Sequence, residues 1–239
     1  MKFKFKTQDY QTQAVNSVID CFDGQPYSEM AAYTRDVGKI TRVQDRQMSL
    51  FDDSMERTME DDDYDAGYRN NDIRISDDKI LENIKNIQGS KNIPESSMLV
   101  NDLGRVSLDV EMETGTGKTF VYTKTMFELN KVYGWTKFII VVPSIAIREG
   151  VYASIQDTVD YFQEEYKKKA RCFIYSSSNL TQLDSFSSDA NINVMIINTQ
   201  AFNASLKEDG TSKEARIIYS KRDEFASRRP IDVIAANRP

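Results

Sequence analysis

Residues 112–119 read Met-Glu-Thr-Gly-Thr-Gly-Lys-Thr, and this glycine-rich stretch decides how the rest of the chain is interpreted. It follows an apolar run, Val106–Glu111, that is typical of a strand, and it precedes a helical pattern that begins at Lys118. Glycine at 115 and 117 lets successive backbone N–H groups turn toward one anion with no side chain in the way. The positive end of the following helix adds a fixed partial charge. The stretch therefore predicts a phosphate-binding loop.

The residue types in this loop indicate a nucleoside triphosphate site with ATP and Mg²⁺ as cofactors. Lys118 supplies positive charge for the outer phosphates, and Thr119 offers a hydroxyl group to the metal ion, so these two are the predicted catalytic residues. The predicted cofactor contacts in the loop are Glu113, Thr114, Gly115, Thr116, Gly117, Lys118 and Thr119. The strict pattern begins with glycine, whereas Met112 stands there, a relaxation shared by several ATP-driven nucleic-acid motors. The alternative is a strand-to-helix turn that binds nothing.

Composition narrows the class of protein. A chain of 239 residues with 40% hydrophobic residues can bury one sizeable α/β domain plus an appendage. No basic-then-apolar leader and no run of eighteen apolar residues is present, so we expect a cytoplasmic protein with no membrane partner. Two cysteines lack metal spacing and are expected to be reduced core residues. The absence of histidine excludes histidine metal sites and serine-type triads.

The net charge of −6 is distributed very unevenly. The residues from Asp45 to Asp65 include nine carboxylates and two arginines, which gives this stretch a charge of −7. The remainder of the chain therefore carries a charge of +1. A near-neutral domain can still follow a phosphate backbone through a few local contacts, so the acidic balance does not exclude DNA or RNA.

Short apolar runs alternate with helical segments after about residue 98, which predicts an α/β fold with a parallel sheet covered by helices. We expect three domains or segments: 1–24, an N-terminal segment and helix; 25–97, an acidic and partly mobile insertion; and 98–239, the ATP-binding domain. The expected strands are Val106–Glu111, Phe138–Val142, Arg171–Tyr175, Val194–Asn198 and the start of another at Val233–Ala235. The first expected helix is capped by Asp9 and stopped by Gly24. The others run from Asp77 to Gln88, Lys118 to about Lys131, and Ile145 to about Lys168, and a serine-rich connection spans Ser176–Asn191.

Two further stretches follow predicted strands at the carboxyl edge of the sheet. Pro143 and Ser144 end one strand, with Arg148 in the next helix, and Thr199 follows another. A helix N-terminus and hydroxyl groups at that edge can hold a nucleic-acid phosphate. An ordinary turn or helix cap explains each stretch equally well when it is taken alone.

Gln11 is the third candidate, because a glutamine amide can pair with both the amino group and a ring nitrogen of adenine. Phe5 is a candidate to stack on the base, although the alternation of Lys and Phe over residues 3–6 is also typical of an edge strand.

In this order and spacing, the pieces resemble superfamily 2 helicases and translocases, with motif I at Met112–Thr119, motif Ia at Val142–Gly150 and a motif Ib-like segment at Asn198–Phe202. The spellings at 112–119 and at 141–150, Val-Val-Pro-Ser-Ile-Ala-Ile-Arg-Glu-Gly, are most similar to the restriction (Res) subunit of type III restriction–modification enzymes. The resemblance covers residues 1–23 and about 99–239.

The resemblance implies a RecA-like P-loop domain in the N-terminal part of a DNA-dependent ATPase motor, in which ATP hydrolysis drives translocation before cleavage. It implies that Gln11 binds adenine, that Pro143, Ser144, Arg148 and Thr199 bind the moving strand, and that the partners are double-stranded DNA and a modification (methyltransferase) subunit. Family members hold Mg²⁺ with a later Asp-Glu box, whereas Asp232 here is followed by Val233. We therefore expect a fragment of an ATP hydrolase and site-specific deoxyribonuclease subunit that hydrolyses no ATP alone.

Several alternatives stay open at this point. A helicase of another superfamily 2 branch shares these motifs, a P-loop kinase without a nucleic-acid role shares the loop, and a binding module could use the acidic insertion to dock a partner. The spacing Asp61-x-Asp63-x-Asp65 resembles a calcium loop, but glycine stands at 67 and the twelfth position is Asp72, so a solvated acidic loop is the favoured interpretation.

Overall fold

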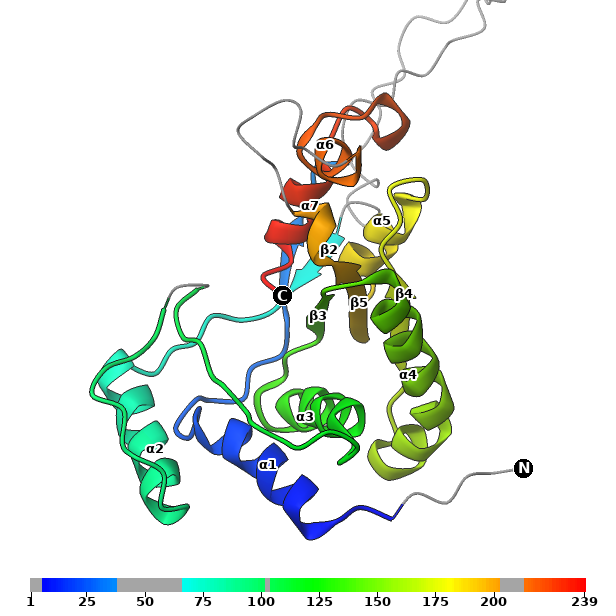
Figure 1. Cartoon of the computed structure of the whole chain (residues 1–239). Helices are drawn as coiled ribbons and strands as arrows, with labels where there is room; N and C mark the ends of the chain where they lie inside the picture. Colours follow the sequence, from blue (N-terminus) through cyan, green and yellow to red (C-terminus); the bar gives the residue numbers. More distant parts are fainter. Residues whose placement is uncertain (1–5, 38–65, 102–103, 203–212) are drawn as a thin grey trace, which may run out of the picture.

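The computed structural model describes residues 6–37, 66–101, 104–202 and 213–239 (Figure 1). Its helices are α1 (Asp9–Asp20), α2 (Asp77–Ser90), α3 (Lys118–Tyr133), α4 (Ile145–Tyr166), α5 (Thr181–Ser188), α6 (Lys213–Tyr219) and α7 (Pro230–Ala236), with short 3₁₀ turns at Thr199–Ala201 and Asp223–Phe225. Its strands are β1 (Ala31–Thr34), β2 (Ala66–Arg69), β3 (Lys137–Val142), β4 (Ala170–Ile174) and β5 (Ile192–Asn198).

The central sheet is parallel, in the order β3-β5-β4, with β5 in the middle. All seven residues of β5 are buried, because helices cover both faces of the strand. Its side chains alternate between the faces, as the period of two in a strand requires. Val194 and Ile196 pack toward α3 and α4, whereas Met195 and Ile197 pack toward α5, α6 and α7. The predicted α/β fold with a parallel sheet is confirmed.

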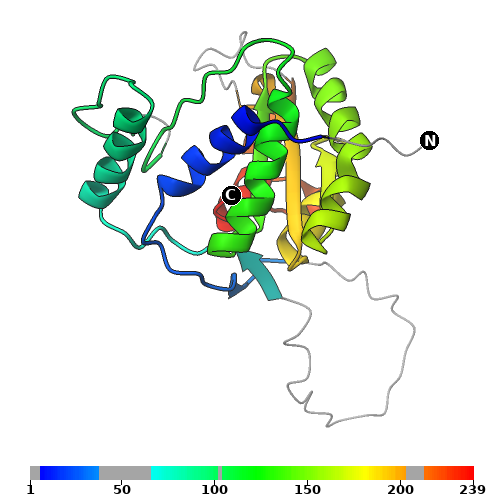
Figure 2. The same cartoon turned by 90° about the horizontal axis from the view of Figure 1, so that it is seen from below.

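The helices form an ordered row beside the sheet. Helix α2 packs on α1, α1 on α3, and α3 on α4, so that α1 and α2 lie beyond the layer that touches the strands (Figure 2). Aromatic rings join α3 to α4: Phe127 stacks on Phe162 with ring centroids 4.9 Å apart and on Tyr166 at 5.0 Å. The Lys124 ammonium group pairs with the Glu165 carboxylate at 2.9 Å beside them. Helix α3 is therefore fixed relative to α4.

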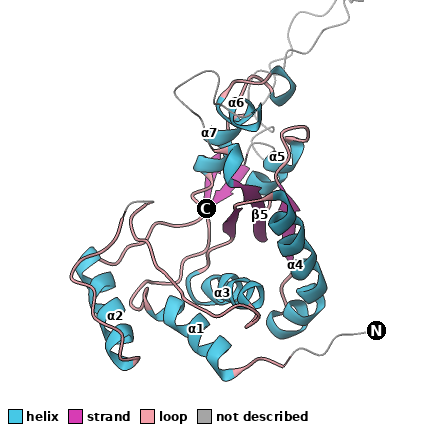
Figure 3. Ribbon diagram, viewed as in Figure 1, coloured by secondary structure: helices cyan, strands magenta, loops and turns pink. Residues whose placement is uncertain are grey.

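Two predicted strands are wrong. Figure 3 draws the chain that leads into α3 as loop, and no strand in the described ranges pairs with Val106–Glu111. The Ser107 N–H donates to the Val100 carbonyl at 2.7 Å, and the apolar side chains at 106 and 108 pack against α1 and α3. Val106 and Leu108 are half-buried by these helices and Val110 is exposed, so the apolar run does not form a strand of the sheet. The second, Val233–Ala235, lies in α7, where Pro230 occupies the first turn with a backbone angle suited to a helix.

The serine-rich connection Ser176–Asn191 also contains a helix that the sequence interpretation missed, α5. Leu183 and Phe186 on this helix are buried against the sheet, so packing holds it despite its short length and poor helix formers.

The stretch 25–97 contributes β1, β2 and α2 to the described structure. Strands β1 and β2 form an antiparallel ribbon in which Thr34 is paired with Ala66. The acidic run Asp45–Asp65, and with it the calcium-like spacing, lies outside the described residues. The division into 1–24, 25–97 and 98–239 stays a prediction.

The side chain of Asn70 holds the outer edge of β3. Its Oδ1 accepts hydrogen bonds from the N–H groups of Thr136 and Lys137, at 2.8 and 2.9 Å, and its Nδ2 donates to the Lys137 carbonyl at 2.8 Å. The Asn70 N–H donates to the carbonyl of Asn237 after α7. One residue that follows the β1–β2 ribbon therefore ties the ribbon to both the sheet and the C-terminal helix.

The two cysteines are free, Cys21 being buried and Cys172 half-buried. Burial raises the pKa of the Cys21 thiol to about 11 and that of Cys172 to about 12, so both are protonated at neutral pH. In the part of the chain that the structure describes, no helix combines the length and the apolar character needed to cross a bilayer.

Lys137, the first residue of β3, has a fully buried side chain. Its ammonium group donates to the carbonyl of Phe186 at 2.5 Å and to that of Asp189, which lie at the C-terminal end of α5 where helix carbonyls lack partners. Burial lowers the pKa of Lys137 to about 8, while the nearby Asp189 carboxylate acts in the opposite direction.

Stability should therefore depend on pH through Lys137. The unfolded chain binds a proton at this lysine up to pH 10.5, but the folded chain releases it near pH 8, so folding becomes more favourable as pH rises between these values. We expect the free energy of unfolding of the wild type, minus that of Lys137→Met, to increase by roughly 2 kcal/mol from pH 7 to pH 9.5. Urea denaturation at both pH values measures this difference, and a difference independent of pH would contradict it.

Candidate nucleotide site

The loop before α3 contains left-handed backbone at two glycines, a conformation that anion-binding turns use. Gly115 and Gly117 have φ angles of +82° and +84°, in the left-handed region that favours glycine. Gly117 is the N-cap of α3, and the Thr116 hydroxyl donates to the Glu113 carbonyl at 2.6 Å, which closes the turn. The loop is therefore a folded turn directly against the N-terminus of a sixteen-residue helix.

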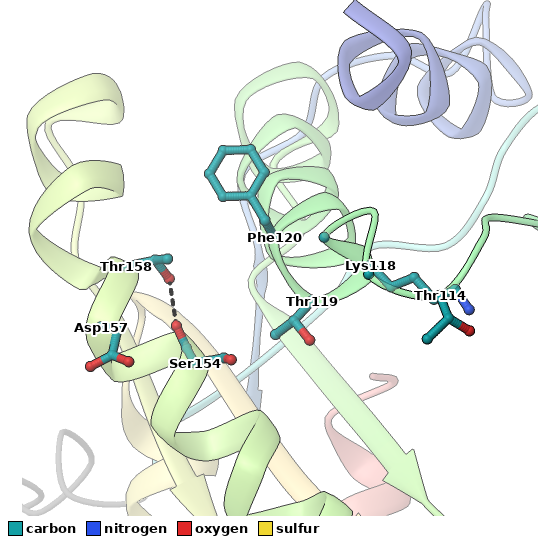
Figure 4. Close-up of a pocket in the computed structure, with 9 residues that line it drawn as sticks. Thr114, Lys118, Thr119, Phe120, Ser154, Asp157 and Thr158 are labelled. Atoms are coloured by element: carbon teal, nitrogen blue, oxygen red, sulfur yellow. Dashed lines mark hydrogen bonds between the residues drawn. The ribbon is translucent and has the colours of Figure 1, made fainter. Parts of the chain in front are cut away.

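A cleft of about 580 Å³ opens between this loop and α4. In Figure 4, Thr114, Lys118 and Thr119 lie on one side of it, and Ser154, Asp157 and Thr158 of α4 lie on the other. The residues that line the cleft are Thr114, Gly115, Gly117, Lys118, Thr119, Phe120, Ser154, Asp157 and Thr158. Its volume is in the range of small-molecule sites, and its wall combines backbone donors with hydroxyl groups.

The charges in this cleft suit a polyphosphate. Lys118 is exposed and makes no hydrogen bond or ion pair with any described residue, so its ammonium group is available to a ligand. The first N–H groups of α3 have no intrahelical acceptor, and the helix dipole is positive there. Asp157, on the opposite wall, brings the one carboxylate among the lining residues. The chain thus offers charge and backbone donors for phosphate on one side of the cleft and oxygen atoms on the other.

Gln11 lies against the loop. Its Nε2 donates to the Thr116 carbonyl at 3.0 Å, and its Oε1 accepts from the Gln8 N–H at 3.0 Å. Each end of an amide can form a second hydrogen bond, because the NH₂ group has two hydrogens and the oxygen has two lone pairs. Both ends of this buried amide are engaged within the protein, with one hydrogen and one lone pair left unused, and Gln11 is not among the residues that line the cleft. The predicted stacking residue, Phe5, lies outside the described residues.

The structure brings two of the predicted nucleic-acid stretches together. Val142 of β3 is paired with Asn198 of β5, so Pro143 and Thr199 leave adjacent parallel strands at the same edge of the sheet, and both are exposed. This agrees with the expectation that ligands bind at the carboxyl ends of parallel strands.

Ser144 and Arg148 lie at the start of α4. The Ser144 hydroxyl accepts a hydrogen bond from the Ile147 N–H at 3.3 Å and so caps the helix, while the Arg148 guanidinium pairs with Glu149 at 2.9 Å. Ser154, in the wall of the cleft, lies ten residues after Ser144, which is about 15 Å along the same helix. One continuous helix therefore connects the two predicted sites. The assignments of individual residues to adenine, phosphate, metal or nucleic acid stay predictions.

Sequence reasoning missed the α4 side of the cleft, Ser154, Asp157 and Thr158. Their spacing of three and four residues places them on one face of a helix, a signal that the sequence does carry. It also missed Tyr10, whose hydroxyl donates to the Thr116 carbonyl at 3.1 Å. No local sequence pattern predicts this contact, because the two residues are 106 positions apart.

The two loop glycines provide a matched test of how closely α1 approaches the loop. A Cβ atom at Gly117 would lie 2.7 Å from the Gln11 Nε2, whereas one at Gly115 would meet nothing within 4 Å. Since both have the same kind of φ angle, each alanine substitution should cost about 1 kcal/mol for the left-handed backbone. We expect Gly117→Ala to lower the free energy of unfolding, measured in urea, by more than Gly115→Ala, because the Gln11 amide must move and give up its hydrogen bond to Thr116.

Adding Gln11→Ala to Gly117→Ala removes the atom with which the new Cβ collides. The extra loss at position 117 should then disappear relative to Gln11→Ala alone. Equal losses for the two single glycine variants would show that α1 does not press on the loop.

Comparison with known proteins places this geometry in a family. A family model for "Type III restriction enzyme, res subunit" matches residues 4–225. The chain is 37% identical over 110 residues to the Type III restriction-modification enzyme EcoP15I Res subunit of Escherichia coli, which covers 45% of this chain and 11% of that protein. It is 34% identical over 110 residues to the EcoPI Res subunit of Escherichia phage P1, with the same coverage.

A shorter match, 48% identical over 64 residues, is to the StyLTI Res subunit of Salmonella typhimurium and covers 27% of this chain and 6% of that protein. The aligned stretches thus span about a tenth of the length of these relatives. The family model, in contrast, matches most of this chain, and it agrees with the P-loop and the parallel sheet described above. The chain therefore belongs to the family of type III restriction enzyme Res subunits, as a RecA-like, superfamily 2 motor domain.

Proposed function

We propose that the chain binds ATP and Mg²⁺ in the cleft between residues 112–119 and α4. The observation that carries the proposal is the loop itself: two glycines with positive φ angles at the start of α3, followed by a lysine without a partner among the described residues and a threonine that both line the cleft. The site fits the group chemically. Lys118 and the backbone N–H groups would hold the phosphates, Thr119 would hold the metal ion, and Gln11 would pair with adenine.

We further propose that the whole protein is an ATP hydrolase that moves along double-stranded DNA and acts with a modification subunit in restriction. The family membership supports this, together with the placement of Pro143 and Thr199 at one edge of the sheet. The bound Mg²⁺ would neutralise the charge that develops on the phosphates during transfer. The residues described here would hold the triphosphate, and α4 would connect the cleft to the predicted DNA contact.

Replacing Lys118 tests the nucleotide site. The ammonium group forms charge-assisted hydrogen bonds with phosphate, so we expect Lys118→Ala to weaken binding of Mg-ATP about 10- to 100-fold in isothermal titration calorimetry. Lys131, exposed at the other end of α3, provides the control, and Lys131→Ala should bind as the wild type does. The nucleotide site is refuted if both variants bind Mg-ATP equally well.

Replacing Arg148 tests the nucleic-acid contact. Each phosphate contact that is lost lowers affinity and reduces its dependence on salt, so we expect Arg148→Gln to weaken binding of a duplex about 3- to 10-fold at low salt. Fluorescence anisotropy with a labelled 30-base-pair duplex measures this effect, with Lys131→Gln as a variant of the same charge. An equal loss of affinity in both variants would mean that only the net charge of the protein matters. Wild-type affinity in Arg148→Gln would show that Arg148 does not contact the duplex.

A further inference from the structure

Two side chains at the start of α1 donate hydrogen bonds to a single backbone carbonyl of the phosphate loop. The Tyr10 hydroxyl lies 3.1 Å and the Gln11 Nε2 lies 3.0 Å from the Thr116 carbonyl oxygen. A carbonyl oxygen has two lone pairs, so this pair of donors saturates it. Helix α1 therefore holds the loop through this one carbonyl group.

This contact fixes the direction of a peptide plane. The peptide bond between Thr116 and Gly117 is planar and trans, so its C=O and N–H groups point to opposite sides. With the carbonyl held toward α1, the Gly117 N–H is directed away from α1. That N–H has no acceptor among the described residues, and Gly117 lines the cleft. The two donors thus present a backbone N–H group to a ligand in the cleft.

Helix α1, which carries both donors, is packed firmly on α3. Val15 and Ile19 of α1 are buried against Val121 and Tyr133 of α3, and the Tyr133 hydroxyl donates to the Ile19 carbonyl at 2.8 Å. Because α1 and the helix that follows the loop form one packed unit, a donor on α1 keeps its place when a ligand pulls on the loop.

The two donors differ in what else they do. Gln11 is buried and also accepts the Gln8 N–H in the capping box of α1, so its replacement disturbs the helix. Tyr10 is 47% exposed, and the bond to Thr116 is the hydrogen bond that the structure gives its hydroxyl. Tyr10→Phe therefore removes one hydrogen bond and leaves the ring in place.

From this geometry we propose that Tyr10 is a positioning residue for phosphate: its hydroxyl, acting through the Thr116 carbonyl, orients the Gly117 N–H toward the polyphosphate of the bound nucleotide. The proposal rests on the proposed function. It predicts that the effect of Tyr10 belongs to the phosphate chain and not to the base.

The test compares the 239-residue wild type with Tyr10→Phe by isothermal titration calorimetry, using Mg-ATP, Mg-GTP and Mg-tripolyphosphate as probes. We expect Tyr10→Phe to weaken binding of all three by the same factor, about 3- to 10-fold, because one neutral hydrogen bond supports the phosphate contact. The ratio of the ATP and GTP affinities should not change. Tyr219→Phe is the matched control, since the Tyr219 hydroxyl also donates to a backbone carbonyl, that of Phe202, away from the loop.

Each outcome has one meaning. Wild-type affinity for tripolyphosphate in Tyr10→Phe overturns the proposal, and so does a loss confined to ATP, which would place Tyr10 at the base. A merely structural role would lower the free energy of unfolding in urea and leave the affinities of the folded protein unchanged. If the wild type binds these probes no better than Lys118→Ala does, the nucleotide site itself fails, and with it the proposal built on that site.

Discussion

The complete burial of β5 is the constraint on which the other elements depend. A strand whose seven residues are all buried can lie only in the middle of a sheet with helices on both faces, so β3 and β4 must flank it. Its alternating side chains then determine which helices belong to which face. The register that pairs Val142 with Asn198 follows from the same packing, and it delivers two exposed polar turns to one edge. A substitution that forced a polar side chain onto β5 would disturb both faces and that edge together.

The sequence predicted the elements whose periodicity reports a buried face. Helices α3 and α4 and the three sheet strands were recognised because apolar residues recur at the spacing of each structure. The prediction at Val106–Glu111 was wrong for a physical reason: apolar residues show that part of a segment is covered, but they do not show what covers it. Here α1 and α3 half-bury Val106 and Leu108, while Val110 stays exposed. Helix α5 could not be predicted from its serine-rich composition, because tertiary packing stabilises it.

For the candidate site, the sequence predicted the backbone conformation of the loop better than the contacts that hold the loop in place. Positive φ angles at Gly115 and Gly117 follow directly from what glycine permits, and the N-terminus of α3 follows from the helical pattern. What holds the loop in place could not be predicted in this way. The contacts of Gln11 with Thr116, and the α4 wall opposite, join residues that are far apart in the sequence, and only the packing of α1 and α4 on α3 brings them together.

The ribbon of β1 and β2 has a consequence for the chain between them. Because Thr34 is paired with Ala66, and Asn70 then joins the edge of β3, both ends of the intervening stretch are held independently of its content. A change in the number of residues between them therefore acts on the described fold through these two ends, and the entropy lost in closing a flexible loop grows only with the logarithm of its length. The hydrogen bonds described for the sheet edge and for the loop before α3 come from residues outside the acidic run, so a change within that run leaves their donors and acceptors in the chain.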